Sequence, residues 1–311
     1  MQLSLVIPCY NEGENVQAMH AACVEAFANC GYAYEMVFVD DGSKDDTFTQ
    51  LKNLHANSEN MRVVRLSRNF GKESAIYAGL QHAKGDFVCI IDADLQQPPA
   101  LVRDMVVFLE LNSDVDCVAA YQQQRSDGRV LKFFKNNFYR IINRITEIEF
   151  VQGASDFRTM RRSMVDAILA LGEQNRFAKG IFSWVGFATH YVPYIAAARH
   201  AGSTKWNKRR LFRYAFDGII SFSTMPLRLA SVAGVLSALG ALIYGLVVII
   251  QRLFWSVAVP GFATLAVLIL FLGGLQLLGL GLIGEYLAKT YTETKARPIY
   301  VAREVLEPKD G

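Results

Sequence analysis

The chain has 311 residues, of which 52% are hydrophobic and 20% charged, and its net charge of +3 is too small to indicate a nucleic-acid partner. Its five cysteines form no CxxC pair, which argues against a zinc or disulfide framework. The first ten residues lack the basic segment of a secretory signal peptide, and Pro8 interrupts their apolar run. We therefore expect the N-terminal domain to stay in the cytoplasm.

Short β-branched segments alternate with helical ones over the first 120 residues. The expected strands are 3–8, 36–39, 62–66, 87–91 and 117–120, and a further strand-like run lies at 189–193. The expected helices lie near 15–29, 45–56, 72–82 and 99–111. Strands separated by helices of this length predict an α/β fold with a doubly wound, mostly parallel sheet. Such sheets bind ligands at the carboxyl ends of their strands.

Acidic side chains follow two of these strands, as Asp40-Asp41 and as Asp92 and Asp94. At an extended strand end Asp92 and Asp94 point the same way, so their carboxylates repel each other unless a cation lies between them. Oxygen ligands suit Mg²⁺ or Mn²⁺, which also take phosphate oxygens. Gln96 is placed to add a ligand or to orient one. The pattern predicts a metal and diphosphate site at one edge of the sheet.

Two long uncharged runs, 229–250 and 254–284, lie near the C-terminus. As a helix at about 1.5 Å per residue, the first would be roughly 33 Å long, enough to span a bilayer. The second is long enough for another span plus a short turn at Pro260-Gly261. Lysine and arginine gather before the first run and after the second, with only Arg252 between them. The positive-inside rule then predicts a two-helix transmembrane hairpin with both termini in the cytoplasm.

Two amphipathic segments, 128–145 and 206–222, lie between the acidic strand ends and the apolar runs. The second sets basic residues against aromatic ones, a pattern typical of a helix lying in a membrane interface, although a solvated basic linker is an alternative. We therefore expect a cytoplasmic catalytic domain at 1–200, interface helices at 201–227, two transmembrane helices at 228–288 and a cytoplasmic tail at 289–311.

Several motifs extend over nearly the whole chain. They are Val6-Ile7-Pro8-Cys9-Tyr10-Asn11-Glu12, Asp40-Asp41-Gly42-Ser43, Arg68-Asn69-Phe70-Gly71-Lys72, Asp92-Ala93-Asp94-Leu95-Gln96, Ser155-Asp156-Phe157-Arg158, Gly202-Ser203-Thr204-Lys205-Trp206 and Gly284-Glu285-Tyr286 with Arg297-Pro298-Ile299-Tyr300. Together they resemble the family 2 glycosyltransferases, and among these the bacterial polyprenyl-phosphate glycosyltransferases, relatives of dolichyl-phosphate mannose synthase. One departure is Gln97, where many members have Asp.

The resemblance implies a GT-A-type fold that binds a nucleotide-sugar. Pro8, Tyr10, Glu12, Asp40 and Asp92 would bind the donor, and Asp92, Asp94 and Gln96 would hold Mg²⁺ or Mn²⁺. Lys72 would either contact the donor or serve only to begin a helix. The family inverts the anomeric centre by direct displacement, with the cation offsetting charge on the departing diphosphate.

The resemblance also implies an acceptor site for a lipid phosphate. Asp156, expected in a loop, is the family's candidate catalytic acid residue, and Asp94 and Arg158 would share in catalysis. Arg125, Arg129 and Arg158 would gather the acceptor phosphate, with Lys205 closing over the site, although Arg129 equally fits a solvated helix face. The second pKa of such a phosphate is about 6, so a general base is a weak requirement at neutral pH.

These observations predict transfer of one sugar from a nucleotide-sugar to undecaprenyl or another polyprenyl phosphate at the inner membrane, for cell-envelope glycan modification. UDP-glucose is the favoured donor, with UDP-N-acetylglucosamine, GDP-mannose and UDP-aminoarabinose as alternatives. A processive polysaccharide synthase is disfavoured because no Gln-x-x-Arg-Trp element is present and one hairpin cannot form a pore. A non-catalytic protein, such as a membrane-anchored nucleotide-sugar sensor or a flippase accessory, would not need the full acidic set. The resemblance allows a homo-tetramer.

Overall fold

The computed structural model describes residues 2–28, 30–123, 154–197, 220, 223–255 and 261–309. The chain forms two compact units, one of Met1–Tyr214 with Arg297–Gly311 and the other of Ala215–Ala296. Arg125, Arg129 and Lys205 lie outside the described residues, as do both expected amphipathic segments except Ile220.

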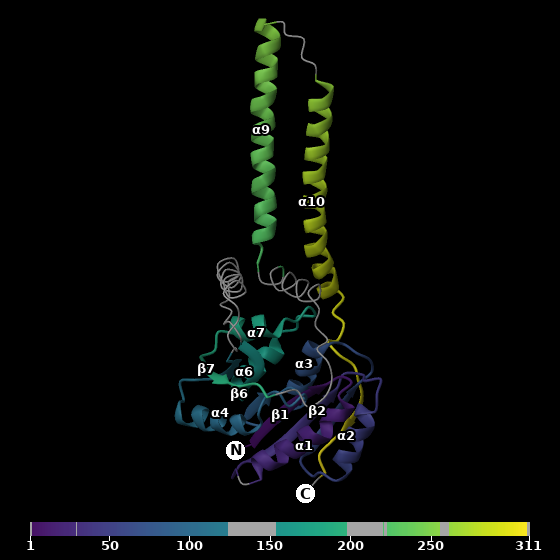
Figure 1. Ribbon diagram of the computed structural model, residues 1–311, viewed down its shortest axis with the longest axis vertical. Coiled ribbons are helices and arrows are strands. Elements are labelled where there is room, and N and C mark those ends of the chain that lie inside the picture. Colours follow the sequence, from purple (N-terminus) through teal and green to yellow (C-terminus); the bar gives the residue numbers. More distant parts are fainter. Residues whose placement is uncertain are drawn as a thin grey trace. The chain divides into compact units, whose positions relative to one another are not determined.

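An eight-stranded sheet forms the centre of the first unit (Figure 1). The strands are β1 Gln2–Cys9, β2 Ala33–Asp40, β3 Met61–Leu66, β4 Phe87–Ile90, β5 Cys117–Gln122, β6 Ala154–Arg161, β7 Thr189–Tyr194 and β8 Ala302–Leu306. Their order is β7-β5-β6-β4-β1-β2-β3-β8. Strands β3, β2, β1 and β4 are mutually parallel, as are β5 and β7, whereas β6 and β8 run antiparallel to their neighbours.

Helices connect the parallel strands as expected. They are α1 Gly13–Phe27, α2 Thr47–Ala56, α3 Lys72–His82 and α4 Ala100–Leu111, followed by α6 Arg162–Ala170 and α7 Ala178–Trp184. Helix α3 occupies the predicted range 72–82. The expected α/β fold with a mostly parallel sheet is therefore confirmed.

Two strands were not expected. Residues 155–158, expected in a loop, belong to β6, which lies between β4 and β5 and pairs with both. Residues 302–306, expected in a C-terminal tail, form β8 and extend the sheet beyond β3. The sheet thus contains a polar antiparallel strand next to the predicted acidic site, and its far edge is built from the end of the chain.

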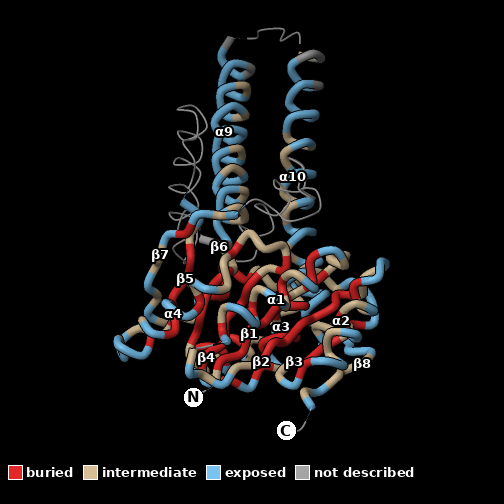
Figure 2. Tube along the Cα trace, turned by 60° about the horizontal axis from the view of Figure 1, so that its bottom comes forward, coloured by how far each residue is buried: buried red, intermediate tan, exposed pale blue. Residues whose placement is uncertain are grey.

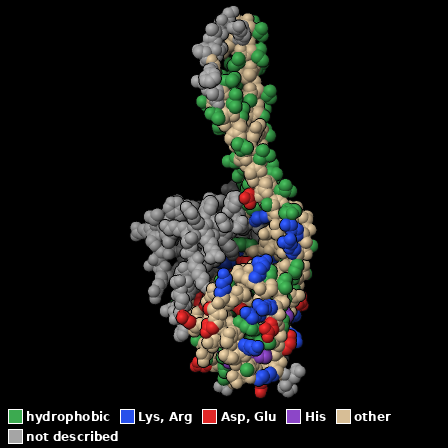
Figure 3. All heavy atoms as spheres, turned by 90° about the vertical axis from the view of Figure 1, so that its right-hand side faces the viewer, with side chains coloured by type: hydrophobic (Ala, Val, Ile, Leu, Met, Phe, Trp, Pro, Cys, Tyr) green, Lys and Arg blue, Asp and Glu red, His purple; other side chains and the backbone are tan. Residues whose placement is uncertain are grey.

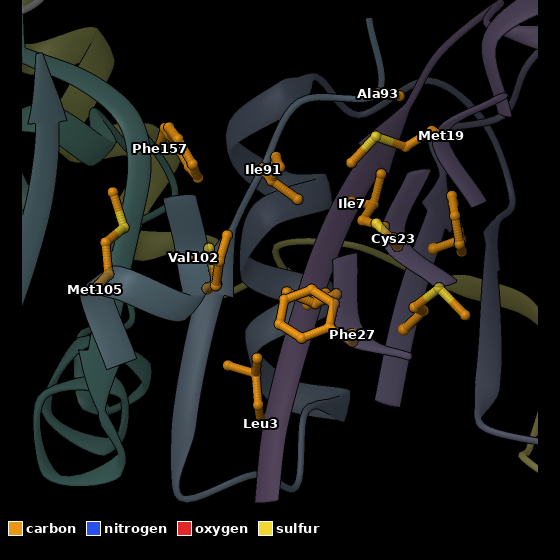
Figure 4. Close-up of a cluster of buried hydrophobic side chains, with 14 of the residues drawn as sticks. Leu3, Ile7, Met19, Cys23, Phe27, Ile91, Ala93, Val102, Met105 and Phe157 are labelled. Atoms are coloured by element: carbon orange, nitrogen blue, oxygen red, sulfur yellow. The ribbon is translucent and has the colours of Figure 1, made fainter. Parts of the chain in front are cut away.

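The hydrophobic core is formed by strands β1–β7 and the helices α1, α2 and α4, and part of it is drawn in Figure 4. Residues 3–7 of β1 are continuously buried, as is typical of a central parallel strand covered on both faces. Figure 4 shows Met19, Cys23 and Phe27 of α1 with Leu3 and Ile7 of β1 in this cluster. This packing holds the strand ends that carry the acidic residues.

The second unit contains two long apolar helices, α9 Met225–Trp255 and α10 Phe262–Thr294. Their apolar stretches, Met225–Gln251 and Val267–Thr294, have mean hydropathies of 2.4 and 2.3, and their described residues are exposed or half-buried (Figure 2). Hydrophobic side chains cover both helices on the face drawn in Figure 3, whereas charged side chains gather on the sheet-containing unit. At about 1.5 Å per residue each stretch exceeds the roughly 30 Å of a bilayer core. Both helices are long and apolar enough to cross a membrane.

Candidate active site

The acidic residues of four strands meet at one edge of the sheet. The parallel strands β1, β2 and β4 end there, with Cys9 opposite Asp40 in the register. Strand β6 begins at the same edge because it runs the other way, and Arg158 pairs with Ile90 of β4. Continuing this register by two residues brings Asp156 next to Asp92. Two predicted site residues that are 64 positions apart therefore lie side by side.

Lys72 joins these two carboxylates. Its Nζ lies 2.7 Å from Oδ1 of Asp92 and 2.9 Å from Oδ2 of Asp156, and its side chain remains 46% exposed. It is the first residue of α3, which follows Gly71 with a φ of 101°. A positive φ suits glycine, and here it turns the chain into the helix so that Lys72 faces the strand ends. Lys72 therefore both begins a helix and belongs to the acidic site.

The ion pairs change the ionisation of all three groups. Burial would lower the pKa of the Lys72 ammonium, but the charges of Asp156 and Asp92 outweigh burial and raise it. Burial would raise the pKa of Asp156, yet Lys72 and, to a lesser degree, Lys179 lower it to about 2. For Asp92 burial prevails over Lys72, and its pKa is raised. Asp156 is therefore ionised. The ionised form of Asp92 is less favoured, and additional positive charge nearby would stabilise it.

The predicted metal ligands lie on the turn that follows β4. Leu95 adopts a φ of 62°, and the N–H of Gln96 donates to Oδ1 of Asp94 at 3.2 Å. The described part of the chain contains no group of three His, Cys, Asp or Glu side chains that could hold a metal ion. A cation here would depend on Asp92, Asp94, the amide oxygen of Gln96 and added phosphate oxygens. This all-oxygen donor set fits Mg²⁺ or Mn²⁺.

Gln97 holds the first of these carboxylates and is almost completely buried, with 4% exposed. Its Oε1 accepts from the N–H of Asp92 at 2.8 Å, and its Nε2 donates to Oδ2 of Asp92 at 3.1 Å. The resemblance singled out Gln97 only as a departure from the usual Asp. The structure shows that this residue orients Asp92.

The loop before α3 is held by Asp41. Its two carboxylate oxygens accept from the N–H groups of Phe70 and Gly71 at 2.7 and 2.9 Å. Burial raises the pKa of Asp41, and these two N–H groups oppose the rise. Gly42 adds a steric requirement, because it has a φ of 63° and a Cβ there would lie 2.3 Å from the backbone of Arg68. The Asp-Asp-Gly motif therefore fixes the start of α3 and, with it, Lys72.

The loops after β1 and β2 are joined by hydrogen bonds. The N–H of Asn11 donates to Oγ of Ser43 at 2.9 Å, and the N–H of Glu12 donates to Oγ1 of Thr47 at 2.9 Å. Oδ1 of Asp40 accepts from the N–H of Ser43 at 3.0 Å, while its buried Oδ2 has no hydrogen-bond partner among the described residues. These contacts hold Glu12 and Asp40, two of the predicted donor-binding residues, at this edge.

The Glu12 carboxylate accepts from Nδ2 of Asn15 at 2.6 Å. Pro8 is the second-to-last residue of β1, and Tyr10 follows the strand directly. Both are half-buried.

Arg158 is held within the protein. Its guanidinium carbon lies 3.7 Å from the ring centre of Phe182 in α7, its Nη2 donates to the Ser155 carbonyl at 3.0 Å, and the residue is 4% exposed. Phe182 and α7 were not among the predicted site residues. A role for Arg158 in contacting an acceptor stays a prediction.

Comparison with known proteins identifies the family of the chain. The family described as glycosyl transferase family 2 matches residues 4–169, which include every acidic residue described above. The chain belongs to glycosyltransferase family 2. It is accordingly a glycosyltransferase, and the resemblance in its motifs is confirmed.

The family 2 relatives match over almost the full length of the chain. The Bacillus subtilis protein CsbB is 41% identical over 306 residues, covering 98% of this chain and 92% of its own length. A prophage bactoprenol glucosyl transferase homolog of Escherichia coli strain K12 is 40% identical, with 98% and 99% covered. The bactoprenol glucosyl transferase of Shigella phage SfV is 40% identical, with 97% and 98% covered.

Among solved structures, mannosyl-3-phosphoglycerate synthase from Rubrobacter xylanophilus is similar with a TM-score of 0.46 and 18% identity, covering 70% of this chain and 72% of that one.

Proposed function

We propose that this glycosyltransferase moves one glucose from UDP-glucose to undecaprenyl phosphate at the cytoplasmic face of the inner membrane. The observation that carries the proposal is the similarity at about 40% identity to bactoprenol glucosyl transferases, which extends through both apolar helices. An enzyme with a lipid acceptor needs its catalytic unit near a bilayer. Basic residues flank the helix pair on the sides of both termini, which favours a cytoplasmic catalytic unit.

The donor would bind at the edge where β1, β2 and β4 end. Pro8, Tyr10, Glu12 and Asp40 would line the nucleoside pocket, and the hydrogen bonds between the two loops support such a preformed wall. Lys72 is exposed enough to reach a diphosphate while its ammonium stays at the acidic site. We therefore place the donor diphosphate beside Lys72 and Asp92.

Asp92, Asp94 and Gln96 would hold Mg²⁺ or Mn²⁺. A bound cation would offset the charge that builds up on the departing nucleoside diphosphate. Gln97 prepares this arrangement because it fixes both the backbone and the carboxylate of Asp92. Lys72 adds positive charge at the same place.

In the proposed reaction a phosphate oxygen of the acceptor attacks the anomeric carbon, and the bond from that carbon to the nucleoside diphosphate breaks. A single displacement of this kind inverts the anomeric configuration. The acceptor needs little help with deprotonation, because its second pKa is about 6. With a pKa of about 2, Asp156 is a weak proton acceptor. We assign it instead to orienting Lys72 and the reacting groups.

The acceptor phosphate would be gathered by cations. Arg125, Arg129 and Lys205 remain the proposed residues for this role, and Lys179 adds positive charge near Asp156. Arg158 is already engaged by Phe182 and Ser155, so we expect it to support this region from within.

The test uses the full chain in detergent with undecaprenyl phosphate and either Mg²⁺ or Mn²⁺. UDP-glucose, UDP-N-acetylglucosamine, GDP-mannose and UDP-aminoarabinose are offered separately, and the lipid product is identified by mass spectrometry. We expect a lipid-linked hexose only with UDP-glucose. Product from another donor alone would replace glucose in the proposal, and no lipid-linked sugar from any donor would refute it.

A further inference from the structure

Glu73 lies next to Lys72 but faces a different part of the structure. Its Oε2 accepts from the backbone N–H of Ala178 at 2.9 Å. Ala178 is the first residue of α7, and Glu73 is the second residue of α3. The first turn of α3 therefore places the Lys72 ammonium at the acidic site and the Glu73 carboxylate at the start of α7.

Helix α7 lies next to β6 (Figure 1). Phe182 of α7 stacks on the Arg158 guanidinium, and the charge of Lys179 helps to lower the pKa of Asp156. The position of α7 therefore affects the surroundings of both Asp156 and Arg158. Any contact that fixes the start of α7 acts on the site indirectly.

The start of α7 lies beside a small cavity. This cavity lies between α3, α6 and α7, lined in part by Glu73, Arg176, Ile181 and Phe182. Helix α7 also has only seven residues, too few to be stable without tertiary contacts. The hydrogen bond from Ala178 to Glu73 satisfies one of the helix's first N–H groups beside this cavity.

We propose that Glu73 is a positioning residue for sugar transfer, which holds α7 so that Phe182 and Lys179 keep Arg158 and Asp156 in place. The predicted effect on kcat rests on the proposed function. Glu73 does not touch the expected substrates in this account. It acts through α7.

The electrostatic surroundings of Glu73 support a role near neutral pH. The groups that act on it are Lys72 on its own helix, Asp156 on β6, Arg176 just before α7 and the N–H of Ala178 at the start of α7. Burial and the charge of Asp156 raise the pKa of Glu73 to about 7, while the N–H of Ala178, Lys72 and Arg176 oppose the rise. A charged carboxylate is a stronger acceptor than a neutral carboxyl group, so the contact to α7 strengthens as the pH rises through 7.

Two substitutions separate the hydrogen bond from the charge. Glu73→Ala removes both, whereas Glu73→Gln keeps an oxygen that can accept from Ala178. Glu14→Gln is the matched control, because Glu14 is also the second residue of its helix but is exposed. All variants are made in the full chain.

The first measurement is kinetic. We expect E73A to lower kcat about 10- to 100-fold, as misplacement of catalytic groups does, with the KM for UDP-glucose within about twofold of wild type. E73Q should restore kcat to within roughly threefold, and the ratio of wild-type to E73Q kcat should rise up to roughly threefold between pH 6 and pH 8. E14Q should match wild type throughout. Equal kcat for E73A and E14Q would overturn the inference.

The second measurement is backbone amide exchange, which needs no activity. We expect faster exchange in residues 178–184 of E73A, with no change in α1 or β8, and near wild-type exchange in E73Q. Unchanged exchange in α7 would overturn the inference, as would a general increase across the sheet with a matching rise in KM. If wild type makes no lipid product, the proposed function fails, and the exchange experiment still decides the role of Glu73.

Discussion

Gln97 and Asp92 form two hydrogen bonds with each other, one through the Asp92 backbone and one through its carboxylate. A neutral amide can donate to a carboxylate, whereas an aspartate at position 97 would be an acceptor with the same charge as Asp92. In this chain the neighbour of Asp92 therefore helps to keep it ionised. Burial raises the pKa of Asp92, and the hydrogen bond from Gln97 opposes that rise because it stabilises the ionised carboxylate.

Gln97→Ala should weaken the site without unfolding the protein. Because the two hydrogen bonds orient a predicted metal ligand, we expect a loss of about 10- to 100-fold in activity or in metal affinity. Transfer is measured as a function of Mn²⁺ concentration, which should need to be higher in the variant. Gln17→Ala, at an exposed position of α1, is the control. Wild-type metal dependence in Q97A would show that Gln97 does not orient a metal ligand.

Lys72→Met should make activity depend on pH. In wild type the Asp156 carboxyl has a pKa of about 2 and stays ionised between pH 5 and pH 8. Without Lys72, burial raises the pKa of Asp156. A growing fraction of Asp156 is then protonated as the pH falls from 8 to 5. We expect the ratio of K72M to wild-type kcat to fall steadily from pH 8 to pH 5, in addition to an overall loss of about 100-fold from the missing cation. Lys52→Met on the exposed face of α2 is the control, and a constant ratio for K72M would contradict this account.

The sequence was sufficient to predict the parallel half of the fold. Strands β1, β2 and β4 are apolar runs followed by acidic residues, and the carboxyl ends of parallel strands share an edge, so Asp40 and Asp92 could be placed together. The partnership between Lys72 and Asp156 could not be derived this way. It depends on the register in which β6 pairs with β4, and no local sequence pattern predicts that register.

Strand β6 was not predicted because its polar sequence lacks the apolar run by which the other strands were recognised. Three of its eight residues are Asp or Arg, and their side chains contact partners that are distant in the sequence. Arg161, for instance, donates to the carbonyls of Val115 and Leu109. Strand β8 was missed for a different reason, because it pairs with β3, which lies more than 230 residues earlier in the sequence. The side chains that join them include Arg62, whose Nη1 contacts Glu307.

Arg62→Ala should destabilise the catalytic unit strongly. Arg62 is 2% exposed and lies 3.5 Å from Glu35, which also accepts from the Ser4 hydroxyl at 2.6 Å. Removing the guanidinium leaves the Glu35 carboxylate buried without its cation, which costs about 3–5 kcal/mol of unfolding free energy. Since 1 kcal/mol corresponds to about 2–4 °C in a domain of this size, we expect the melting temperature to fall by roughly 10 °C.

Glu307→Ala provides the comparison for Arg62, because it removes the other partner at an exposed position. The Glu307 side chain is 57% exposed, so its loss should cost less than about 1 kcal/mol. Both variants are compared by thermal unfolding in the same detergent. Similar losses for the two would show that the C-terminal contact, and not the buried pair with Glu35, dominates the stability of this edge.

Asp94→Asn should separate metal binding from folding. The substitution keeps the size of the side chain and an oxygen that can accept from the Gln96 N–H, but it removes the charge that a divalent cation would need. We expect transfer to fall at least about 100-fold, because charge on the leaving diphosphate is then poorly offset. The melting temperature should be unchanged, and Asp114→Asn, at an exposed loop position, should behave as wild type. UDP binding measured by calorimetry should improve with Mn²⁺ in wild type and not in D94N. Full activity of the wild-type enzyme after treatment with EDTA would rule out a divalent cation at this turn and leave Lys72 as the main cation beside Asp92.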